Sequence, residues 1–417
     1  MSLFEWNPVF NLVMKIKHDY VKSFGSIDTY DFEKWLLKLN VNEYTEFFSC
    51  LKVKQRNNYI LIRYGMDEMN SCMWSDPDSL YRECRSVVID IEKEQLVIAS
   101  FRKFFNLNEV EENSLRLIQE ELKKAKSVEI TDKMDGSMQC VRFYKGDIFI
   151  SGTMAIDRKE SWRLEDGYSK LSENYRRMIV ENHEYTFIFE YISRRDSHLV
   201  IYTKEQEGMY LIGMRNVFDG RQLSYNEVKG FAVKYNIPMT SIEDKTFNEV
   251  YNSLADYKSH QKEGWVINID GHMIKLKCDD YIQLHRVLCK VSSINAIIKS
   301  MADGTYDDLL CRIPEAYSQK VTSIFEAIND YLKRINENIE KCYLRAPKED
   351  RKEFMIWVEE NCSIEIRGYL RQKYLGKDYN ILKTCYNDGV RYKKIKEIEI
   401  GKKYRYLFAD LEVELSG

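Results

Sequence analysis

The chain has 417 residues, of which 44% are hydrophobic and 31% charged, so it can form a real core and is too long for one average domain. Its 63 Lys and Arg nearly balance its 66 Asp and Glu, for a net charge of -3. This balance excludes a whole-chain basic footprint and confines any nucleic-acid site to a local patch.

The cysteines and the first residues bear on the cellular compartment. Ten cysteines stand at scattered spacings with no C-x-x-C pair, and no basic segment followed by an apolar one opens the chain. These features predict reduced thiols in an intracellular, cytoplasmic protein. No apolar run is long enough to cross a bilayer, so we expect no membrane partner.

The middle of the chain is predicted to form short strands. Runs rich in β-branched and aromatic residues, separated by Gly, Asp and Lys clusters, occupy residues 86–90, 96–99, 147–150, 185–189, 199–202 and 210–213. Asp270-Gly271 stands between two further apolar runs, 265–267 and 273–276, which predicts a β-hairpin. Close strand spacing with short turns favours an antiparallel sheet over a doubly wound parallel one.

The hydrophobic period changes after about residue 290. Apolar residues then recur at steps of three and four, which predicts a core-facing amphipathic helix: Val321, Ile324, Phe325, Ile328, Leu332, Ile335 and Ile339. We therefore predict an α+β fold, with an antiparallel-sheet domain over residues 1–289 and a mainly α-helical domain over residues 290–417. The aromatic-rich residues before about 80 carry no chemical motif and are expected to form an outer layer of the first domain.

One short string points to chemistry. Lys133-Met134-Asp135-Gly136 is a K-x-D-G element, although by itself it could be an ordinary surface turn with Asp135-Gly136 at the bend. Further strings surround it in chain order: Glu83-Cys84-Arg85, KFFNLNE at residues 103–109, Phe189-Glu190, Glu263-Gly264-Trp265-Val266 and Lys275-Leu276-Lys277. Because Lys275 and Lys277 alternate along a strand, both ammonium groups project from one face. Two like charges on one face suit an anion such as a phosphate chain.

These strings, in this order, resemble the ATP-dependent RNA ligase 1 family, the bacteriophage T4 RNA ligase 1-like branch of the covalent nucleotidyltransferases, over about residues 80–285. The resemblance implies an adenylyltransferase domain and a C-terminal domain concerned with substrate choice. It implies lysine adenylylation by ATP, transfer of AMP to an RNA 5′-phosphate, and attack by an RNA 3′-OH that expels AMP. The expected partner is RNA with such ends, with a nicked tRNA among the candidates, and the expected role is RNA or tRNA repair.

The resemblance makes Lys133 the nucleophile that becomes lysyl-AMP. A free lysine has a pKa of about 10.4 and is protonated at neutral pH, so we expect the pKa of Lys133 to be lowered. Desolvation or the neighbouring cations Arg85, Lys275 and Lys277 could lower it. Lys275 and Lys277 would also neutralise charge developing on the α-phosphate and on the pyrophosphate.

The resemblance also supplies the remaining nucleotide contacts. Glu190 and Glu263 would bind the ribose and a divalent metal, and the resemblance leaves open which glutamate binds which. Mg²⁺, or alternatively Mn²⁺, fits because it takes one or two carboxylates plus phosphate oxygens. Phosphate-holding and nucleotide-lining residues would be Arg85, Lys103, Asp135 and Gly136. The T4 member has a further lysine in a K-G-S setting, whereas residues 150–153 here hold no basic residue, which puts that phosphate contact in doubt.

Two other features have competing interpretations. Residues 366–405 hold twelve Lys and Arg, four Asp and Glu, and six interleaved tyrosines, typical either of an RNA-contacting surface or of a solvated helical face with inward tyrosines. A second group could suggest zinc, although its spacing matches no standard zinc pattern: His272, Cys278, His285 and Cys289.

Two alternative functions share parts of these motifs. An mRNA-capping guanylyltransferase uses the same K-x-D-G nucleophile but would place a β-rich domain after the hairpin. A catalytically silent RNA-binding relative would have lost part of the charged set. The helical period after residue 290 disfavours the first alternative, and the intact set disfavours the second.

Overall fold

The chain divides into two compact units, the first ending at Ile282 and the second beginning at Gln283. The structure, a computed structural model, describes residues 4–27, 29–65, 73–196, 198–291, 294–310, 315–382 and 384. The division falls inside helix α9 (Asp279–Val291). This helix also contains residue 289, at which the sequence analysis ends the first domain.

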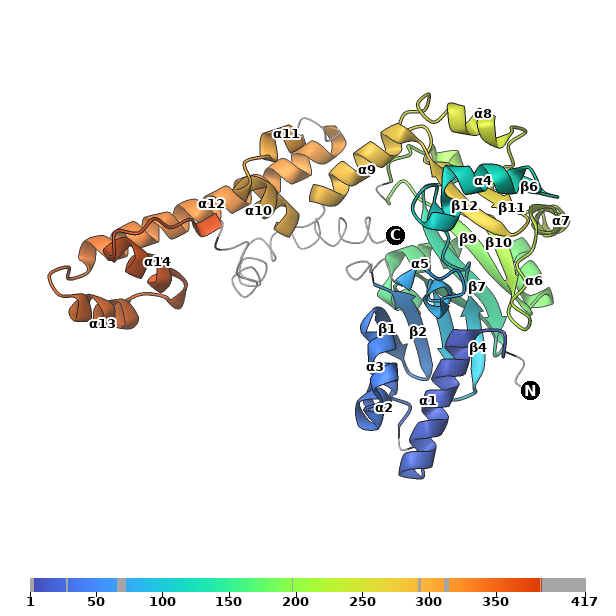
Figure 1. Ribbon diagram of the computed structural model, residues 1–417, viewed down its shortest axis with the longest axis horizontal. Helices are drawn as coiled ribbons and strands as arrows, with labels where there is room; N and C mark the ends of the chain where they lie inside the picture. The colour runs from blue at the N-terminus through green and yellow to red at the C-terminus, as the bar shows by residue number, and fades with distance from the viewer. Residues whose placement is uncertain are drawn as a thin grey trace. The chain divides into compact units, whose positions relative to one another are not determined.

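The first unit opens with helices and continues with strands that pair in chain order. These elements are α1 (Pro8–Phe24), α2 (Phe32–Leu39), α3 (Asn42–Ser49), β1 (Leu51–Arg56), β2 (Tyr59–Tyr64), the 3-10 helix η2 (Leu80–Glu83), β3 (Val87–Asp90) and β4 (Gln95–Ala99). Strands β1 to β4 form an antiparallel first sheet in that order. The helices α1, α2 and α3 lie against it (Figure 1), and this is the outer layer expected for the residues before about 80.

The remaining elements of the first unit build two further sheets. The strands are β5 (Phe105–Asn106), β6 (Val128–Lys133), β7 (Ser137–Tyr144), β8 (Asp147–Gly152), β9 (Tyr185–Ile192), β10 (Gly208–Asn216), β11 (Gly264–Ile269) and β12 (His272–Lys277). Among and beside them lie η3 (Glu111–Asn113), α4 (Leu115–Leu122), η4 (Arg158–Glu160), α5 (Trp162–Lys170), α6 (Glu173–Glu181), η5 (Lys204–Gln206), α7 (Tyr225–Tyr235) and α8 (Phe247–Asn252). The second sheet has the order β10-β9-β7-β8 and the third β5-β12-β11-β6, with β5 parallel to β12 and the other pairs antiparallel.

Buried apolar side chains hold these layers together. One cluster joins α1, α2 and α3 to the first sheet, with Trp35 and Ile60 fully buried. A second lies between the first and second sheets and includes Ile98 and Ile188. A third packs the second sheet against α5, α6 and α7. Because both faces of the second sheet are covered, its strands are apolar on both sides rather than alternating, as the burial of β9 shows.

The structure confirms the antiparallel α+β fold and most predicted strands. The predicted hairpin is β11–β12, joined by Asp270 and Gly271, whose φ angles are 48° and 102°, as a tight primed turn requires. The strand predicted over residues 199–202 is wrong. The Leu199 and Val200 amides donate to Asp135 Oδ2, at 2.9 and 3.0 Å, so they are not free to join a ladder.

The described residues of the second unit are helical. After α9 come α10 (Ile294–Ala302), α11 (Tyr306–Leu310), α12 (Glu315–Arg345), α13 (Arg351–Asn361) and α14 (Ile364–Tyr374). The predicted amphipathic helix is part of α12, and most of its apolar stripe is buried: Val321, Ile324, Ile328, Ile335 and Ile339. This helical content departs from the β-rich domain that the guanylyltransferase alternative requires.

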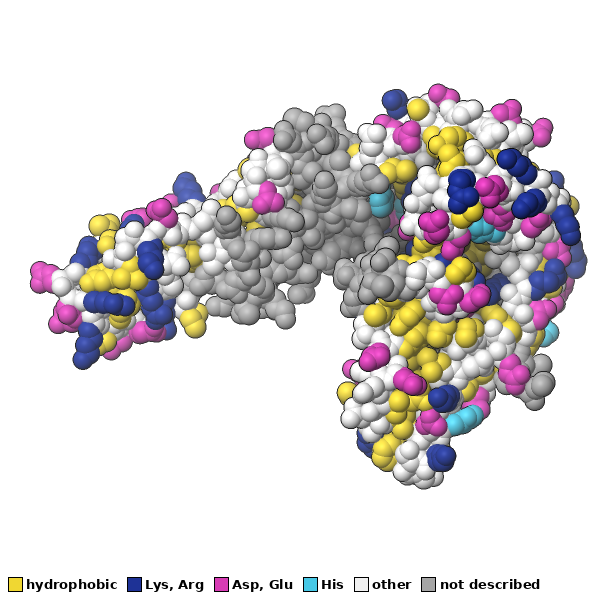
Figure 2. All heavy atoms as spheres, viewed as in Figure 1, with side chains coloured by type: hydrophobic (Ala, Val, Ile, Leu, Met, Phe, Trp, Pro, Cys, Tyr) yellow, Lys and Arg dark blue, Asp and Glu magenta, His cyan; other side chains and the backbone are white. Residues whose placement is uncertain are grey.

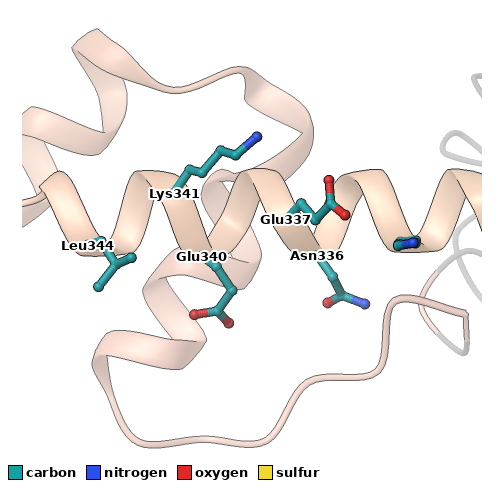
Figure 3. A pocket seen from close by; sticks show the side chains of 6 residues that line it. Asn336, Glu337, Glu340, Lys341 and Leu344 are labelled. Atoms are coloured by element: carbon teal, nitrogen blue, oxygen red, sulfur yellow. The ribbon is translucent and has the colours of Figure 1, made fainter.

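The surface of α12 carries a shallow, open pocket, seen from close by in Figure 3. It is lined by Lys333, Asn336, Glu337, Glu340, Lys341 and Leu344. It shares no residue with the motifs singled out in the sequence.

None of the helices in the described part of the chain has the length and apolar character needed to span a membrane.

Candidate active site

The register of the third sheet brings distant motifs together. Strand β11 lies between β6 and β12, and Gly264 at its start stands opposite both Lys133 and Lys277. Glu263 directly precedes Gly264 and is therefore flanked by the two lysines. Lys275 lies two residues before Lys277, on the same face of β12, as the alternation predicts.

Glu263 bridges the two lysines. Its Oε2 accepts a hydrogen bond from Lys133 Nζ at 2.7 Å, and its Oε1 lies 2.8 Å from Lys277 Nζ. The Glu263 side chain is only 3% exposed. Burial by itself would raise the pKa of this carboxyl, but the two ammonium groups outweigh burial and lower it to about 2. Glu263 is therefore ionised at neutral pH and serves as the counter-ion inside the lysine cluster.

The pKa of Lys133 differs from the sequence expectation. Burial by itself would lower it, but Glu263, Glu190 and Asp135 outweigh burial, so the pKa of Lys133 is raised. The expected lowering by neighbouring cations is therefore wrong for the protein without nucleotide. The lysine with a pKa well below its usual range is Lys275, because it is buried and close to other cations: Arg85, Lys103, Lys133 and Lys277.

Arg85 and Lys275 are cations without an acidic partner among the described residues. Lys275 Nζ lies 4.9 Å from the centre of the Phe104 ring, and the Arg85 guanidinium lies 4.9 Å from the same centre. Arg85 Nη1 is buried and has no hydrogen-bond partner there. A buried, unsatisfied guanidinium N–H costs free energy, and an anion between Arg85 and Lys275 would remove that cost. This orphaned donor is what a phosphate group would satisfy.

Lys103 is enclosed by aromatic rings. Its Nζ lies 4.7 Å from the centre of the Tyr64 ring, 5.1 Å from that of Phe105 and 5.7 Å from that of Trp74. Cation–π contacts of this kind hold the ammonium group in place without neutralising it. Lys103 lies close to Lys275 and helps to lower the pKa of Lys275.

Glu190 and Gly136 connect the second sheet to the K-x-D-G motif. The Gly136 N–H donates to Glu190 Oε1 at 3.1 Å. A Cβ on Gly136 would lie 2.6 Å from the Tyr191 carbonyl oxygen, so only glycine permits this approach. Burial raises the pKa of Glu190 to about 7, although Lys133 opposes the shift. Glu190 and Glu263 therefore differ in protonation at neutral pH.

Asp135 holds residues that sequence reasoning missed. Its Oδ1 accepts a hydrogen bond from Tyr281 at 3.0 Å, and its N–H donates to Tyr202 Oη at 2.8 Å. His198 Nδ1 lies 3.7 Å from the same carboxylate. No motif marks these three side chains. They come from a loop whose sequence resembles a strand and from the first turn of α9, so only the folded chain reveals them.

Glu190 and Glu263 suit a divalent metal that is held jointly with a nucleotide. No group of three or more His, Cys, Asp or Glu side chains gathers to hold an ion within the parts of the chain that the structure describes. Glu190 and Glu263 would supply two carboxylates, leaving the other positions to phosphate oxygens and water. Mg²⁺ is bound in this way in nucleotide sites, so the donor set fits Mg²⁺ or Mn²⁺ held jointly with a nucleotide.

Comparison with known proteins concerns the same residues. The model of a family described as RNA ligase matches residues 83–281. The resemblance to RNA ligases is confirmed. The matched segment contains every candidate site residue: Arg85, Lys103, Lys133, Asp135, Gly136, Glu190, Glu263, Lys275 and Lys277.

Individual relatives are distant. A protein of Autographa californica nuclear polyhedrosis virus, provisionally named as a bifunctional polynucleotide kinase/RNA ligase, is 22% identical over 260 residues, which are 57% of this chain and 35% of that protein. The chain thus spans about a third of this relative's length. A mutant RNA ligase of Naegleria gruberi, solved with ATP and Mn, is 15% identical over 45% of this chain and 58% of its own, with a TM-score of 0.35. An archaeal ATP-dependent RNA ligase is 14% identical over 84% of this chain and 94% of its own, with a TM-score of 0.41.

The group that could suggest zinc is dispersed among other contacts. The two ring nitrogens of His272 lie 2.8 Å from Glu121 and 2.9 Å from Asn113. Cys278 is buried beyond the end of β12, and the side chain of Cys289 lies outside the described residues. The RNA ligase segment extends to residue 281 and so includes His272 and Cys278.

The basic, tyrosine-rich tract is described only in its first part. There Arg367 pairs with Glu359 at 2.5 Å, Lys373 pairs with Glu340, and Tyr369 is buried. Figure 2 shows Lys and Arg side chains interspersed with Asp and Glu over α12, α13 and α14. This part fits a solvated helical face with inward tyrosines. The other members considered lie outside the described residues: Tyr386, Arg391, Tyr392, Lys393, Lys394 and Tyr404.

Proposed function

We propose that this protein is an ATP-dependent RNA ligase that joins RNA 5′-phosphate and 3′-OH ends through lysyl-AMP and RNA-adenylate intermediates. The observation that carries the proposal is the lysine cluster around Glu263. Lys133 and Lys277 share that carboxylate, while Arg85 and Lys275 lack any acidic partner in the described chain. A site with surplus buried positive charge suits a triphosphate.

In the first step, Lys133 Nζ would attack the α-phosphorus of ATP. A phosphorus–nitrogen bond forms, and the bond to the pyrophosphate oxygen breaks. Lys133 must first release a proton to solvent, because its 2.7 Å hydrogen bond to Glu263 stabilises the charged form. Lys275 and Arg85 would hold the phosphate oxygens and neutralise the leaving pyrophosphate.

Glu190 and Glu263 would divide between the ribose and a divalent metal. A bound Mg²⁺ would neutralise phosphate charge and help to orient the nucleotide. Glu190, with its pKa near 7, can donate or accept a hydrogen bond at neutral pH, as a ribose hydroxyl requires. Glu263 remains ionised, which suits a metal or a lysine. Asp135 and Gly136 would keep the turn after Lys133 in place.

The later steps would use the same site with RNA in place of pyrophosphate. The 5′-phosphate of one RNA end would take AMP from Lys133, and the 3′-OH of another end would then displace AMP. We propose RNA or tRNA repair as the role, with residues 290–417 contributing to the choice of RNA and a nicked tRNA anticodon loop as one substrate to test. Ligation of nicked tRNA against linear RNA of equal length would decide that choice.

The experiment that tests the proposed function is intact-protein mass spectrometry after incubation with Mg²⁺ and either ATP or GTP. We expect wild-type protein to gain AMP from ATP and Lys133→Ala to gain nothing. Lys229→Ala is the matched control, because Lys229 is exposed on α7, away from the candidate site; it should gain AMP like wild type. A GMP adduct would favour the guanylyltransferase alternative. No adduct from either nucleotide, in protein free of prebound AMP, would favour a silent RNA-binding relative.

A further inference from the structure

An arginine–aromatic surface lies beside the nucleophile motif. The Trp162 ring is contacted by the guanidinium groups of Arg195 and Arg163, which lie 4.3 and 4.9 Å from its centre. The Tyr168 ring is contacted in the same way by Arg158 at 3.8 Å and by Arg176 at 4.7 Å. We call these residues, on η4, α5, the start of α6 and the loop after β9, the arginine–aromatic platform: Arg158, Trp162, Arg163, Tyr168, Arg176 and Arg195.

The positive charge of the platform is only partly neutralised. Arg158 Nε lies 4.0 Å from the exposed Glu165. The acidic residues at the start of η4 and within it pair elsewhere, because Asp157 lies 2.8 Å from Arg56 and Glu160 lies 2.8 Å from Lys54. Arg195 is exposed and has no ion pair within the described chain. Flat guanidinium groups on aromatic rings therefore present both charge and stacking surfaces to solvent.

A buried ion pair fixes this platform to the turn after Lys133. Ser137 follows Gly136 directly, and its Oγ donates to Asp196 Oδ2 at 3.0 Å. Arg163 Nε donates to the same Asp196 oxygen at 2.5 Å. Asp196 is only 5% exposed. One carboxylate thus joins the nucleophile turn to the arginine beneath Trp162.

A second contact fixes α5 to β7, which begins at Ser137. The Gln139 side chain donates to the Arg163 carbonyl oxygen at 2.8 Å. A Cβ on Gly167 would lie 2.1 Å from the end of the Gln139 side chain, so α5 packs closely on that side chain. The two elements lie in contact (Figure 1). The part of the platform formed by α5 is therefore anchored to the strand that follows Lys133.

We propose that the arginine–aromatic platform binds a single-stranded RNA end and leads it to Lys133, with one base stacked at Trp162 and Arg195. This inference rests on the proposed function and names a binding surface for its RNA. Unpaired bases stack on aromatic rings and on guanidinium planes, and arginines hold the backbone between them. The stacking surface is connected to the turn after Lys133 through a single carboxylate, that of Asp196. Such a surface suits an RNA end better than a protein partner.

The test measures binding of a 5′-phosphorylated single-stranded RNA oligonucleotide by fluorescence anisotropy. We expect Trp162→Ala and Arg195→Ala each to weaken binding about tenfold, in the range found when one stacked base loses its aromatic partner. Trp162→Phe should bind nearly as wild type, because it keeps a stacking face. For Arg195→Ala the slope of log affinity against log salt should fall by about 0.7, the value for one phosphate contact on a single strand.

The control is Arg221→Ala, which removes an equally basic, exposed side chain paired with Glu227 at 2.8 Å and should bind as wild type. If Trp162→Ala does not fold, as judged by circular dichroism, Arg195→Ala and Arg195→Glu decide the test, because Arg195 is exposed. Unchanged binding by the platform variants, or equal weakening by Arg221→Ala, overturns the inference. A failure of the proposed function shows separately, as wild-type protein that gains no AMP.

Discussion

Two glutamates beside Lys133 differ in protonation, although both are carboxyls in the same site. Glu263 lies against Lys133 and Lys277, which hold its pKa at about 2. Glu190 is dominated by burial, which raises its pKa to about 7. Neighbouring positive charge and desolvation act in opposite directions on a carboxyl. The contrast makes Glu263 a fixed negative charge and Glu190 a group that titrates near neutral pH.

The pKa of Glu190 predicts how stability depends on pH. Between pH 4.5, where an unfolded glutamate titrates, and about pH 7 the folded protein keeps a proton that the unfolded chain has lost. This group therefore lowers stability as pH rises through that window, by about 3 kcal/mol at most. Because Glu190→Gln does not titrate, its melting temperature minus that of wild type should increase by several degrees from pH 5 to pH 8, measured by calorimetry.

Glu263→Gln is the matched control for this prediction. The folded pKa of Glu263 is lowered to about 2, so its contribution is fully present above pH 4.5 and is lost only below it. Its melting temperature should stay below that of wild type by a constant amount from pH 5 to pH 8. A difference for Glu190→Gln that stays flat over this range would contradict the assignment.

The residue scale also shows why the pKa of Lys133 was predicted with the wrong sign. The motifs pointed to cations near Lys133, but the sign of the pKa shift depends on which charge lies nearest to Nζ. That charge is Glu263 at 2.7 Å, separated from Lys133 by 130 positions in the chain. Strand pairing sets such a distance, and a list of motifs does not contain it.

At the scale of elements, a buried ion pair fixes the segment that carries Arg85. Arg215 on β10 contacts Glu83 at the end of η2 through Nη1 at 2.8 Å, and both side chains are at most 10% exposed. Arg215 also donates to the carbonyl oxygens of Ser100 and Gly220. The pair therefore ties the second sheet to the turn that precedes Arg85.

Breaking that ion pair should be costly. We expect Arg215→Met to lower the free energy of unfolding by about 3–5 kcal/mol, because it leaves Glu83 buried with only Arg102, at 3.3 Å, as a cationic partner. Urea denaturation measures the change. Arg221→Met, at a half-exposed arginine, should change stability by less than about 1 kcal/mol. An equally small effect at Arg215 would show that the pair is dispensable.

The elements themselves were predictable where the signal was local. Alternation in β12 and the Asp270-Gly271 turn identified the hairpin, and the three- and four-residue steps identified α12. Residues 199–202 have the composition of a strand, but the Leu199 and Val200 amides donate to Asp135. Strand β5 is only two residues long, too short to show a period.

At the scale of the whole molecule, the chain has two compact units, each with buried apolar residues of its own. Cooperative unfolding follows the core that holds a unit together, so we expect two calorimetric transitions. A non-hydrolysable ATP analogue with Mg²⁺ should stabilise only the unit that contains Lys133. At a hundredfold excess over the Kd, it should raise the free energy of unfolding of that unit by about 2.7 kcal/mol and raise the temperature of its transition. A single transition, or equal shifts of both, would contradict this expectation.

Tryptophan fluorescence can show which unit responds to the nucleotide. Five of the six tryptophans lie before residue 283, and Trp357 lies after it. Nucleotide binding should change the tryptophan fluorescence of the first unit, so Trp357→Phe should leave that change almost intact. Loss of that change in Trp357→Phe would place the nucleotide response in the second unit instead.

The sequence by itself determined the class of fold and supplied the proposed reacting groups. Three local patterns can be read from the sequence alone: the K-x-D-G string, the paired lysines of β12 and the change from strand to helix periodicity. Tertiary structure decided which charges meet: Glu263 between Lys133 and Lys277, Arg85 without a partner, and Arg163 held by the carboxylate that also binds Ser137. These contacts join residues far apart in the chain, and sheet register and burial set them, so no short pattern can encode them.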